Sequence, residues 1–242
     1  MIMLLGTIVN AAAVVAGGLL GLLFKKGMKP ALEESIHKAL GVAVLVLGFN
    51  GIVSSMFTVS AEGRLSSSGE LLLIVSLVVG MLAGELLRID DRLNSFGRRI
   101  EQRVGAAGFA ASFVNGTLIF CVGAMTIVGA LNDGLYHDPS ILYVKSMLDA
   151  IGAVVFGATL GVGVCFCAIP ILLYEGGLTL LAGLLEPYLQ GALLDQICMV
   201  GYAMVACIGI NFISREAKIK TANLLPALLV PAVWSFLSRL FT

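Results

Sequence analysis

The feature that most constrains this chain is a series of apolar runs, each about as long as a lipid bilayer is thick. A hydrocarbon core of about 30 Å is crossed by about 20 helical residues. Such runs lie at about Ile2–Phe24, Ile36–Phe57, Leu71–Leu87, Phe109–Leu131, Ile141–Gly163, Cys165–Leu185, Leu194–Ile213 and Ala222–Phe241. The sequence therefore predicts an all-α, polytopic bundle of about eight transmembrane helices, with residues 1–242 forming one integral membrane domain.

Composition excludes the main alternative classes. Of the residues, 59% are hydrophobic and only 12% are charged, whereas about a quarter of the residues of a soluble domain are charged. Too little polar surface remains to cover a water-soluble globule. Lys plus Arg and Asp plus Glu both total 15, and no basic patch with interleaved aromatic residues occurs, so a nucleic-acid partner is not expected. Membrane lipid is.

The basic residues alternate with the expected spans. Those of the odd-numbered connections are Lys25, Lys26, Lys29, Lys38, Arg88, Arg92, Arg98, Arg99, Arg103, Arg215, Lys218 and Lys220. The opposite face has only Arg64 and the near-terminal Arg239. Because cytoplasmic loops are enriched in Lys and Arg, the pattern predicts a multi-pass protein of the inner or plasma membrane with both termini outside the cytoplasm. The turn at Gly161–Gly163, which has no polar loop, is the least secure point of this topology.

Residues 88–108 have a different pattern from the apolar runs. Ile89, Leu93, Phe96, Ile100 and Val104 recur at helical spacing, with arginines and acidic residues between them. This periodicity predicts an amphipathic helix that lies in the cytoplasmic membrane interface. A solvated linker helix is the alternative.

Two parts of the sequence resemble each other. Leu40–Asn50 is similar to Val200–Asn211, and Ala16–Leu23 is similar to Leu181–Leu185. The similarity would relate helices one to three to helices six to eight, around a central hairpin of helices four and five. The offset of five helices would make this an inverted repeat, as in many secondary transporters. The alternative is that Gly-, Ala- and Leu-rich helices all look alike; their small residues also permit self-association into a homo-oligomer.

Charged side chains inside the expected spans are the first candidates for a site, because ionisable groups are costly in a bilayer unless they pair or face water. Lys145 and Asp149 are four residues apart in helix five and share one face. They are either a pair that binds and releases an ion or proton, or a neutral structural pair. Glu175 lies in helix six between Pro170 and a pair of glycines, which predicts a loosened helix around an ion or substrate site. A packing kink is the alternative.

Neutral polar residues extend the candidate substrate or ion site. They are Asn115 and Thr117 in helix four and Asn10 in helix one. Such residues commonly join helices by hydrogen bonds, and that role remains open for them. Asn132–Gly134 and His137–Pro139 predict an outer turn between helices four and five, or the mouth of a vestibule.

No catalytic or metal-binding motif is found. The chain has five cysteines, all within apolar runs, and two histidines, which is too little for a convincing metal cluster. It has no nucleophile elbow, phosphate-binding loop or His-Glu-x-x-His motif. The sequence therefore predicts a protein that is not an enzyme and that uses no cofactor or metal.

The central hairpin is the most distinctive part of the sequence. Val114–Gly134, Lys145–Asp149, Gly6–Asn10 and Asn223–Ala227 together resemble the prokaryotic membrane proteins of domain-of-unknown-function family 554. The resemblance covers essentially the whole chain. It implies a multi-helix inner-membrane protein and brings no activity, substrate or site residue.

These observations favour a carrier for a small solute or ion, with its site near the bilayer midplane. Two alternatives remain open. One is an oligomeric ion channel with a polar ring at Asn115 and Thr117. The other is a scaffold or sensor that acts through the amphipathic helix without transporting anything.

Overall fold

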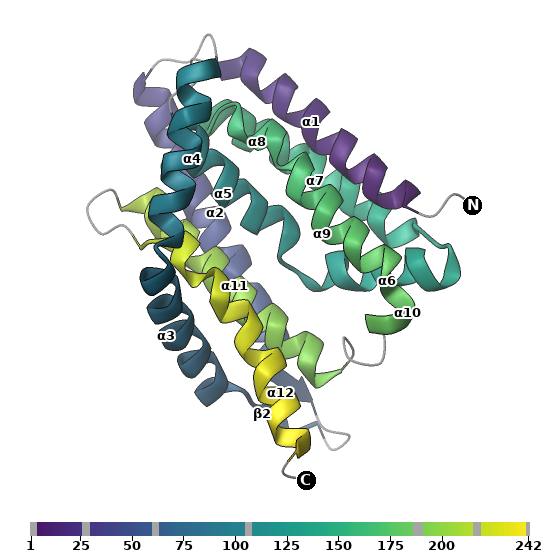
Figure 1. Cartoon of the computed structure of the whole chain (residues 1–242). Coiled ribbons are helices and arrows are strands. Elements are labelled where there is room, and N and C mark those ends of the chain that lie inside the picture. The colour runs from purple at the N-terminus through teal and green to yellow at the C-terminus, as the bar shows by residue number, and fades with distance from the viewer. Residues whose placement is uncertain are drawn as a thin grey trace. The chain divides into compact units, whose positions relative to one another are not determined.

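The structure is a computed structural model that describes residues 4–25, 30–59, 63–104, 108–185, 191–214 and 219–240. Most of these residues are helical (Figure 1). The helices are α1 Leu5–Lys25, α2 Pro30–Met56, α3 Glu70–Leu87, α4 Ile89–Val104, α5 Phe109–Cys121, α6 Ala124–Tyr136, α7 Ser140–Thr159, α8 Gly163–Phe166, α9 Ala168–Leu180, α10 Ala182–Leu185, α11 Ala192–Ile213, the 3-10 helix η1 Thr221–Leu229 and α12 Val230–Leu240. The strands β1 Phe57–Val59 and β2 Leu65–Ser67 form a short antiparallel hairpin.

The predicted class, a transmembrane helix bundle, is confirmed. Among the described residues, 6 helices are long and apolar enough to cross a membrane. A seventh span is formed if Phe109–Cys121 and Met125–Tyr136, which are bent by 62° relative to each other, count as one. The predicted count of about eight stays a prediction, because the apolar helix Thr221–Leu237 is shorter than the others.

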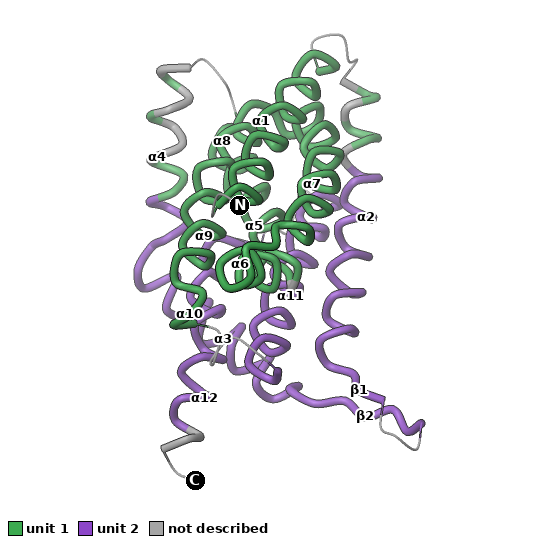
Figure 2. Tube along the Cα trace, turned by 90° about the vertical axis from the view of Figure 1, so that its right-hand side faces the viewer, with its two compact units in different colours: residues 1–37, 93–188 green, residues 38–92, 189–242 purple. Residues whose placement is uncertain are grey.

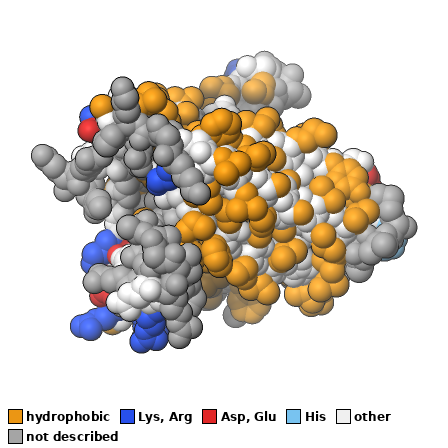
Figure 3. Space-filling model, turned by 90° about the horizontal axis from the view of Figure 1, so that it is seen from above, with side chains coloured by type: hydrophobic (Ala, Val, Ile, Leu, Met, Phe, Trp, Pro, Cys, Tyr) orange, Lys and Arg blue, Asp and Glu red, His pale blue; other side chains and the backbone are white. Residues whose placement is uncertain are grey.

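The surface of the described residues suits a lipid environment. Large apolar side chains such as Leu23, Leu86 and Leu173 are well exposed, by 66%, 84% and 73%. In the view of Figure 3, hydrophobic side chains cover most of the described surface, with few charged groups between them. An exposed apolar surface of this extent needs an apolar solvent or a partner, and lipid supplies it.

The last apolar segment is short in residues because it begins as a 3-10 helix. A 3-10 helix rises about 2.0 Å per residue and an α-helix about 1.5 Å. The 9 residues of η1 and the 11 of α12 therefore extend over about 34 Å. Pro226 lies within η1 and Pro231 in the first turn of α12, where a missing N–H group costs little.

The chain divides into two compact units (Figure 2). Unit 1 comprises residues 1–37 and 93–188, and unit 2 comprises residues 38–92 and 189–242. Unit 1 therefore contains α1 and α5 to α10, and unit 2 contains most of α2, the β-hairpin, α3, α11, η1 and α12. The helices α2 and α4 each contribute residues to both.

In unit 1, α1 and α7 lie side by side and run in the same direction (Figure 1). Gly17 faces Ala150, and one turn further along Gly21 faces Val154. A Cβ atom at Gly21 would lie 2.2 Å from the Val154 carbonyl oxygen. Only glycine permits this approach, which is typical of small-residue packing between membrane helices.

Unit 2 uses the same packing between antiparallel helices. On α2, Gly41 faces Phe212 and Gly48 faces Ala206 of α11, so the two helices run in opposite directions. On α3, a Cβ atom at Gly84 would lie 2.0 Å from the carbonyl oxygen of Asn223 in η1.

The helix directions bear on the predicted inverted repeat. The three helix pairs expected to correspond are α1 with α8–α9, α2 with α11, and α3 with η1–α12. The contacts of the first pair lie in unit 1 and those of the other two pairs lie in unit 2, and each pair packs antiparallel. The alternation of directions is therefore the one that the repeat requires, while the repeat itself stays a prediction.

The predicted interfacial segment, residues 88–108, contains α4. Its start is held in unit 2 by Asn223, whose side-chain Oδ1 accepts a hydrogen bond of 2.8 Å from the Asp90 backbone N–H. The side chains of Phe96, Ile100 and Val104 lie outside the part of the chain that the structure describes, so the amphipathic face stays a prediction. The basic loop residues Lys26, Lys29, Arg215 and Lys218, and the expected start of the first helix at Ile2, also lie outside it.

Candidate functional site

The candidate site lies in unit 1, where α1, α7 and α9 meet. Asn10 comes from the buried face of α1, Lys145 and Asp149 from successive turns of α7, and Glu175 from α9. We call these four residues the polar cluster. Glu175 and Asn10 are fully buried, and Lys145 is 5% exposed. The charged groups are therefore held away from the surface of the unit.

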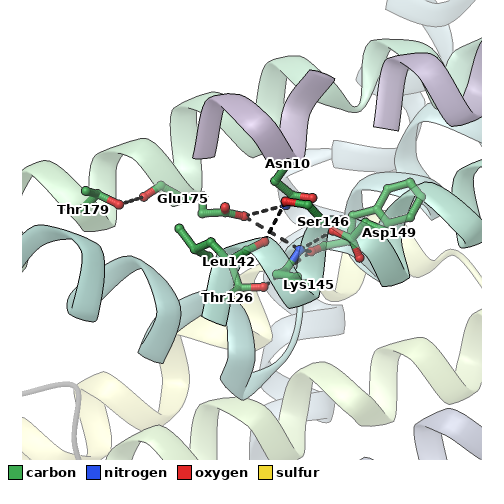
Figure 4. Close-up of polar contacts among 9 residues, drawn as sticks. Asn10, Thr126, Leu142, Lys145, Ser146, Asp149, Glu175 and Thr179 are labelled. Carbon is green, nitrogen blue, oxygen red and sulfur yellow. Dashed lines mark hydrogen bonds and ion pairs between the residues drawn. The ribbon is translucent and has the colours of Figure 1, made fainter. Parts of the chain in front are cut away.

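The cluster is joined by direct contacts (Figure 4). Asn10 Nδ2 donates a hydrogen bond of 3.0 Å to Glu175 Oε2. The Lys145 ammonium lies 3.8 Å from the same carboxylate oxygen, and it also donates to Asp149 Oδ2. One ammonium group is thus shared between two carboxylates.

The Lys145 ammonium also contacts the end of a helix. It donates a hydrogen bond of 2.9 Å to the Phe120 carbonyl oxygen in the last turn of α5. The α5 helix stops because Val122 is extended and Gly123 has a φ of 141°, a region that favours glycine. The last carbonyl groups of a helix lack intrahelical partners and carry a partial negative charge. The break in the bent span therefore adds a third negative group around Lys145.

The charges of the cluster do not balance when both carboxylates are ionised. One ammonium faces two carboxylates, which leaves a formal charge of −1 in a buried place. Glu175 Oε1 and Asn10 Oδ1 have no hydrogen-bond partner among the described residues. A buried unpaired charge and unpaired acceptors are both costly. One additional proton or monovalent cation would neutralise the charge and use these acceptors.

The helix that carries Glu175 differs from its prediction. The α9 helix is continuous from Ala168 to Leu180, so it is not loosened at Glu175. Pro170 lies in the first turn, where proline is tolerated. Gly176 faces Thr7 of α1 and Leu4, which directly precedes α1, and Gly177 has open space beside it. The broken span is instead the fourth expected helix, at Val122 and Gly123.

Two of the predicted site residues lie apart from the four. Thr117 is on α5, beside the Cys167 thiol at the start of α9. Asn115 is two residues earlier on α5 and half-buried. The predicted site residues that the structure joins by direct contacts are therefore Asn10, Lys145, Asp149 and Glu175.

Asp133 was missed as a site residue. The sequence places it in an outer turn, because the fourth apolar run is expected to end at Leu131. In the structure it is 1% exposed and lies within α6, which continues to Tyr136. Asp133 lies within the helix because the break between α5 and α6 moves the end of the fourth span beyond Leu131. Thr7, Thr126 and Thr179 are also buried in unit 1, and threonine in an apolar run gives little indication of a site.

The described residues contain no group of three or more His, Cys, Asp or Glu side chains placed to hold a metal ion. The polar cluster itself offers two carboxylates and one amide.

The spanning helices and the apolar surface define an integral membrane protein of the α-helical class, with a buried charged cluster in one unit. The chain belongs to the family described as "Protein of unknown function (DUF554)", which it matches over residues 5–236. The predicted resemblance is thereby confirmed.

Two relatives match over nearly their whole length. The chain is 30% identical over 236 residues to "Uncharacterized membrane protein YdfK" of Bacillus subtilis (strain 168), covering 98% of this chain and 97% of the relative. It is 27% identical over 235 residues to "Uncharacterized protein YqgA" of Escherichia coli (strain K12), covering 94% of each. No solved structure gives a significant match.

Proposed function

We propose that this protein is a membrane carrier for a small solute or ion, in which the polar cluster binds and releases a monovalent cation or a proton. The observation that carries the proposal is the surplus carboxylate. Lys145 and Asp149 neutralise each other as a pair on α7. Glu175 adds a buried negative charge whose Oε1 atom has no hydrogen-bond partner among the described residues.

A purely structural role explains this arrangement less well. A buried ion pair is retained when its geometry is good and its remaining hydrogen bonds are made. The Lys145–Asp149 pair meets that condition through the Phe120 carbonyl group. Glu175 does not meet the condition, because its Oε1 atom has no hydrogen-bond partner among the described residues. A glutamine at this position could bond Asn10 without adding a charge. Ionisable groups that remain inside membrane helices commonly mark ion or proton pathways.

The bent span supports a carrier because it provides a place for movement. Gly123 separates α5 from α6, which are bent by 62°. Broken helices with free carbonyl groups line the ion sites of many secondary transporters. When the cation leaves, Lys145 faces two ionised carboxylates and the carbonyl end of α5. The balance of charge at the break therefore differs between the loaded and the empty state, and a carrier of this kind would couple that difference to a change of conformation.

The helix directions support the same proposal. Within each unit, the helices expected to correspond pack antiparallel, as an inverted repeat requires. We place the protein in the inner or plasma membrane, with both termini outside the cytoplasm and the basic connections facing the cytoplasm. Its partners in this proposal are lipid, the transported solute or ion, and further copies of the chain through the glycine-rich helix faces.

The test is flux into proteoliposomes that contain the purified protein, screened with protons, alkali cations, halides and small organic acids. We expect saturable flux for the wild type and none for Asp149→Asn or Glu175→Gln. Glu85→Gln makes the same change at a half-exposed carboxylate of unit 2 and should transport normally. Wild-type flux in a folded Glu175→Gln protein would refute the site.

The other two functions predict different results. Conductance across a planar bilayer that does not saturate would indicate a channel, with Asn115 and Thr117 as candidates for its polar ring. No flux for any solute, with loss of the cellular function when residues 88–108 are deleted, would indicate a scaffold or sensor.

A further inference from the structure

Five oxygen atoms in unit 1 are buried and have no hydrogen-bond partner among the described residues. One is Thr117 Oγ1 on α5, and the other four are Thr7 Oγ1, Asn10 Oδ1, Asp133 Oδ2 and Glu175 Oε1. Each of these four belongs to a residue that is at most 1% exposed. Buried polar atoms are nearly always paired with protein or with ordered water. Four such atoms in one unit therefore mark a place where water or a cation completes the bonding.

These atoms follow α1 from its beginning to the polar cluster. The Asp133 carboxylate accepts hydrogen bonds from the backbone N–H groups of Leu4 and Gly6, at the N-terminal end of α1. Thr7 follows directly, and it lies three residues before Asn10 on the same buried face. One turn of a helix separates them, about 4.5 Å along its axis.

Thr7 also adjoins the residue that follows Glu175. A Cβ atom at Gly176 would lie 3.8 Å from the Thr7 methyl group. The row therefore runs from Asp133 through Thr7 to Asn10 and Glu175.

The cluster is also closer to one end of the helices than to the other. Asn10 lies about 7.5 Å from the start of α1, and Lys145 about 7.5 Å from the start of the parallel α7. Glu175 lies about 7.5 Å from the end of the antiparallel α9. The opposite direction along α1 is closed, because Val14 is fully buried and Gly17 and Gly21 pack directly against the α7 backbone.

We propose that Asp133 and Thr7 form the access route by which a proton or a hydrated monovalent cation reaches Asn10 and Glu175. The route opens at the membrane face where α1 and α7 begin. The identity of the ion that uses this route rests on the proposed function. The unpartnered atoms of the row are all oxygens, and two of them belong to the carboxylates of Asp133 and Glu175, which suits a positive charge accompanied by water.

The charged and titratable groups along the route come from several elements. At its inner end Glu175 faces Lys145 and Asp149 of α7 and the Cys121 thiol of α5. At its outer end Asp133 faces His137 and Asp138. Among the described residues, these groups at the two ends are the ones expected to set the pH dependence of entry.

The first test measures access and needs no flux. Thr7→Cys is treated in intact membranes with a charged, membrane-impermeant methanethiosulfonate reagent, added to either face separately. We expect labelling above the wild-type background from the face where α1 begins, and none from the other face. Val14→Cys is the control, because it lies on the same face of α1, two turns deeper and beyond the cluster. If neither Thr7→Cys nor Val14→Cys is labelled by the reagent from either face, the route is refuted.

The second test measures transport through the route. Thr7→Val keeps the shape of the side chain and removes the hydroxyl group, so we expect flux to fall about tenfold, the effect of one buried hydrogen-bonding group. Asp133→Asn should lower flux at least as much, and its folding is checked by the thermal unfolding of the purified protein. Unchanged flux in a folded Thr7→Val protein would refute the route.

The outcomes separate the route from the carrier. Labelling at Thr7→Cys in a protein without flux keeps the route and refutes the carrier. Wild-type flux without labelling and with normal Thr7→Val activity keeps the carrier and refutes the route. Protection of Thr7→Cys by an alkali cation at constant pH would identify a metal cation as the ion that enters. Flux driven by a pH gradient in the absence of alkali cations would identify the proton.

Discussion

The two units of this protein pack their helices by the same means but bury different chemistry. Gly21 in unit 1 and Gly84 in unit 2 both bring a helix against the backbone of its neighbour. Among the described residues, the buried ionisable side chains Asp133, Lys145 and Glu175 all belong to unit 1. The buried polar residues of unit 2 are all neutral: Ser76, Thr221 and Asn223.

The polar groups of the two units also differ in what they bond. In unit 2, Asn223 accepts from the start of α4, and Asn211 both donates to and accepts from the backbone of Ile219. Asn223 thus holds the start of α4, and Asn211 holds the backbone at Ile219. The unpartnered buried side-chain atom of unit 2, among its described residues, is the hydroxyl oxygen of Ser76, which is neutral. In unit 1, Asn10 bonds a carboxylate and leaves its own oxygen unpartnered. A polar group that completes a backbone stabilises the fold, whereas one that leaves acceptors open is available for a ligand.

The largest expected effect comes from removing the shared cation of unit 1. Lys145→Met leaves two carboxylates buried without an ammonium group, and we expect the free energy of unfolding to fall by about 3–5 kcal/mol. Lys220→Met breaks the exposed pair with Glu85 in unit 2 and should cause a much smaller loss of stability. Unfolding of both proteins in detergent, followed by circular dichroism, checks this. Equal losses would remove the distinction between the two units.

A smaller effect is expected from the packing of unit 2. Gly84→Ala places a methyl group on the Asn223 carbonyl oxygen, and we expect it to cost about 1–3 kcal/mol. Flux per folded molecule should stay at the wild-type level. Gly177→Ala on α9 meets open space, and we expect it to gain up to about 1 kcal/mol through helix propensity. Thermal unfolding of the two variants compares them, and an equal loss would show that close approach is not what these glycines provide.

Paired asparagine substitutions sharpen the comparison further. Asn223→Ala removes the acceptor at the start of α4, and we expect a loss of about 1 kcal/mol, as for other helix caps, with flux unchanged. Asn10→Ala should abolish most of the flux, because it removes the partner of Glu175. Both readouts come from the same purified samples. Loss of flux in a fully folded Asn223→Ala protein would assign a part in transport to unit 2 as well.

The smallest effect concerns pH. The hydrogen bond from Lys220 to Glu85 raises the pKa of Lys220 above its usual value of 10.5. Because the folded-state pKa is raised, the stabilisation is present below pH 10.5 and is lost as pH rises through the folded-state pKa. The difference in melting temperature between the wild type and Lys220→Met should therefore shrink above that pH. A difference that stays constant would show that the pair contributes nothing.

Part of the site could be predicted from local spacing. Lys145 and Asp149 are four residues apart, so a helix places them on one face whatever surrounds it. The link from Glu175 to Asn10 spans most of the chain and depends on the antiparallel packing of α9 on α1. Asp133 could not be predicted, because the break at Gly123 moves the end of its span.

The sequence by itself determined the class of this protein and the general position of its helices. Runs of about 20 apolar residues must satisfy their backbone groups internally in lipid, and a helix does so without help from the rest of the chain. Only the tertiary structure decided which polar side chains meet and where the span between α5 and α6 breaks. Hydropathy acts within a segment, whereas the meeting of Lys145 with Glu175 depends on glycines that let separate helices approach closely.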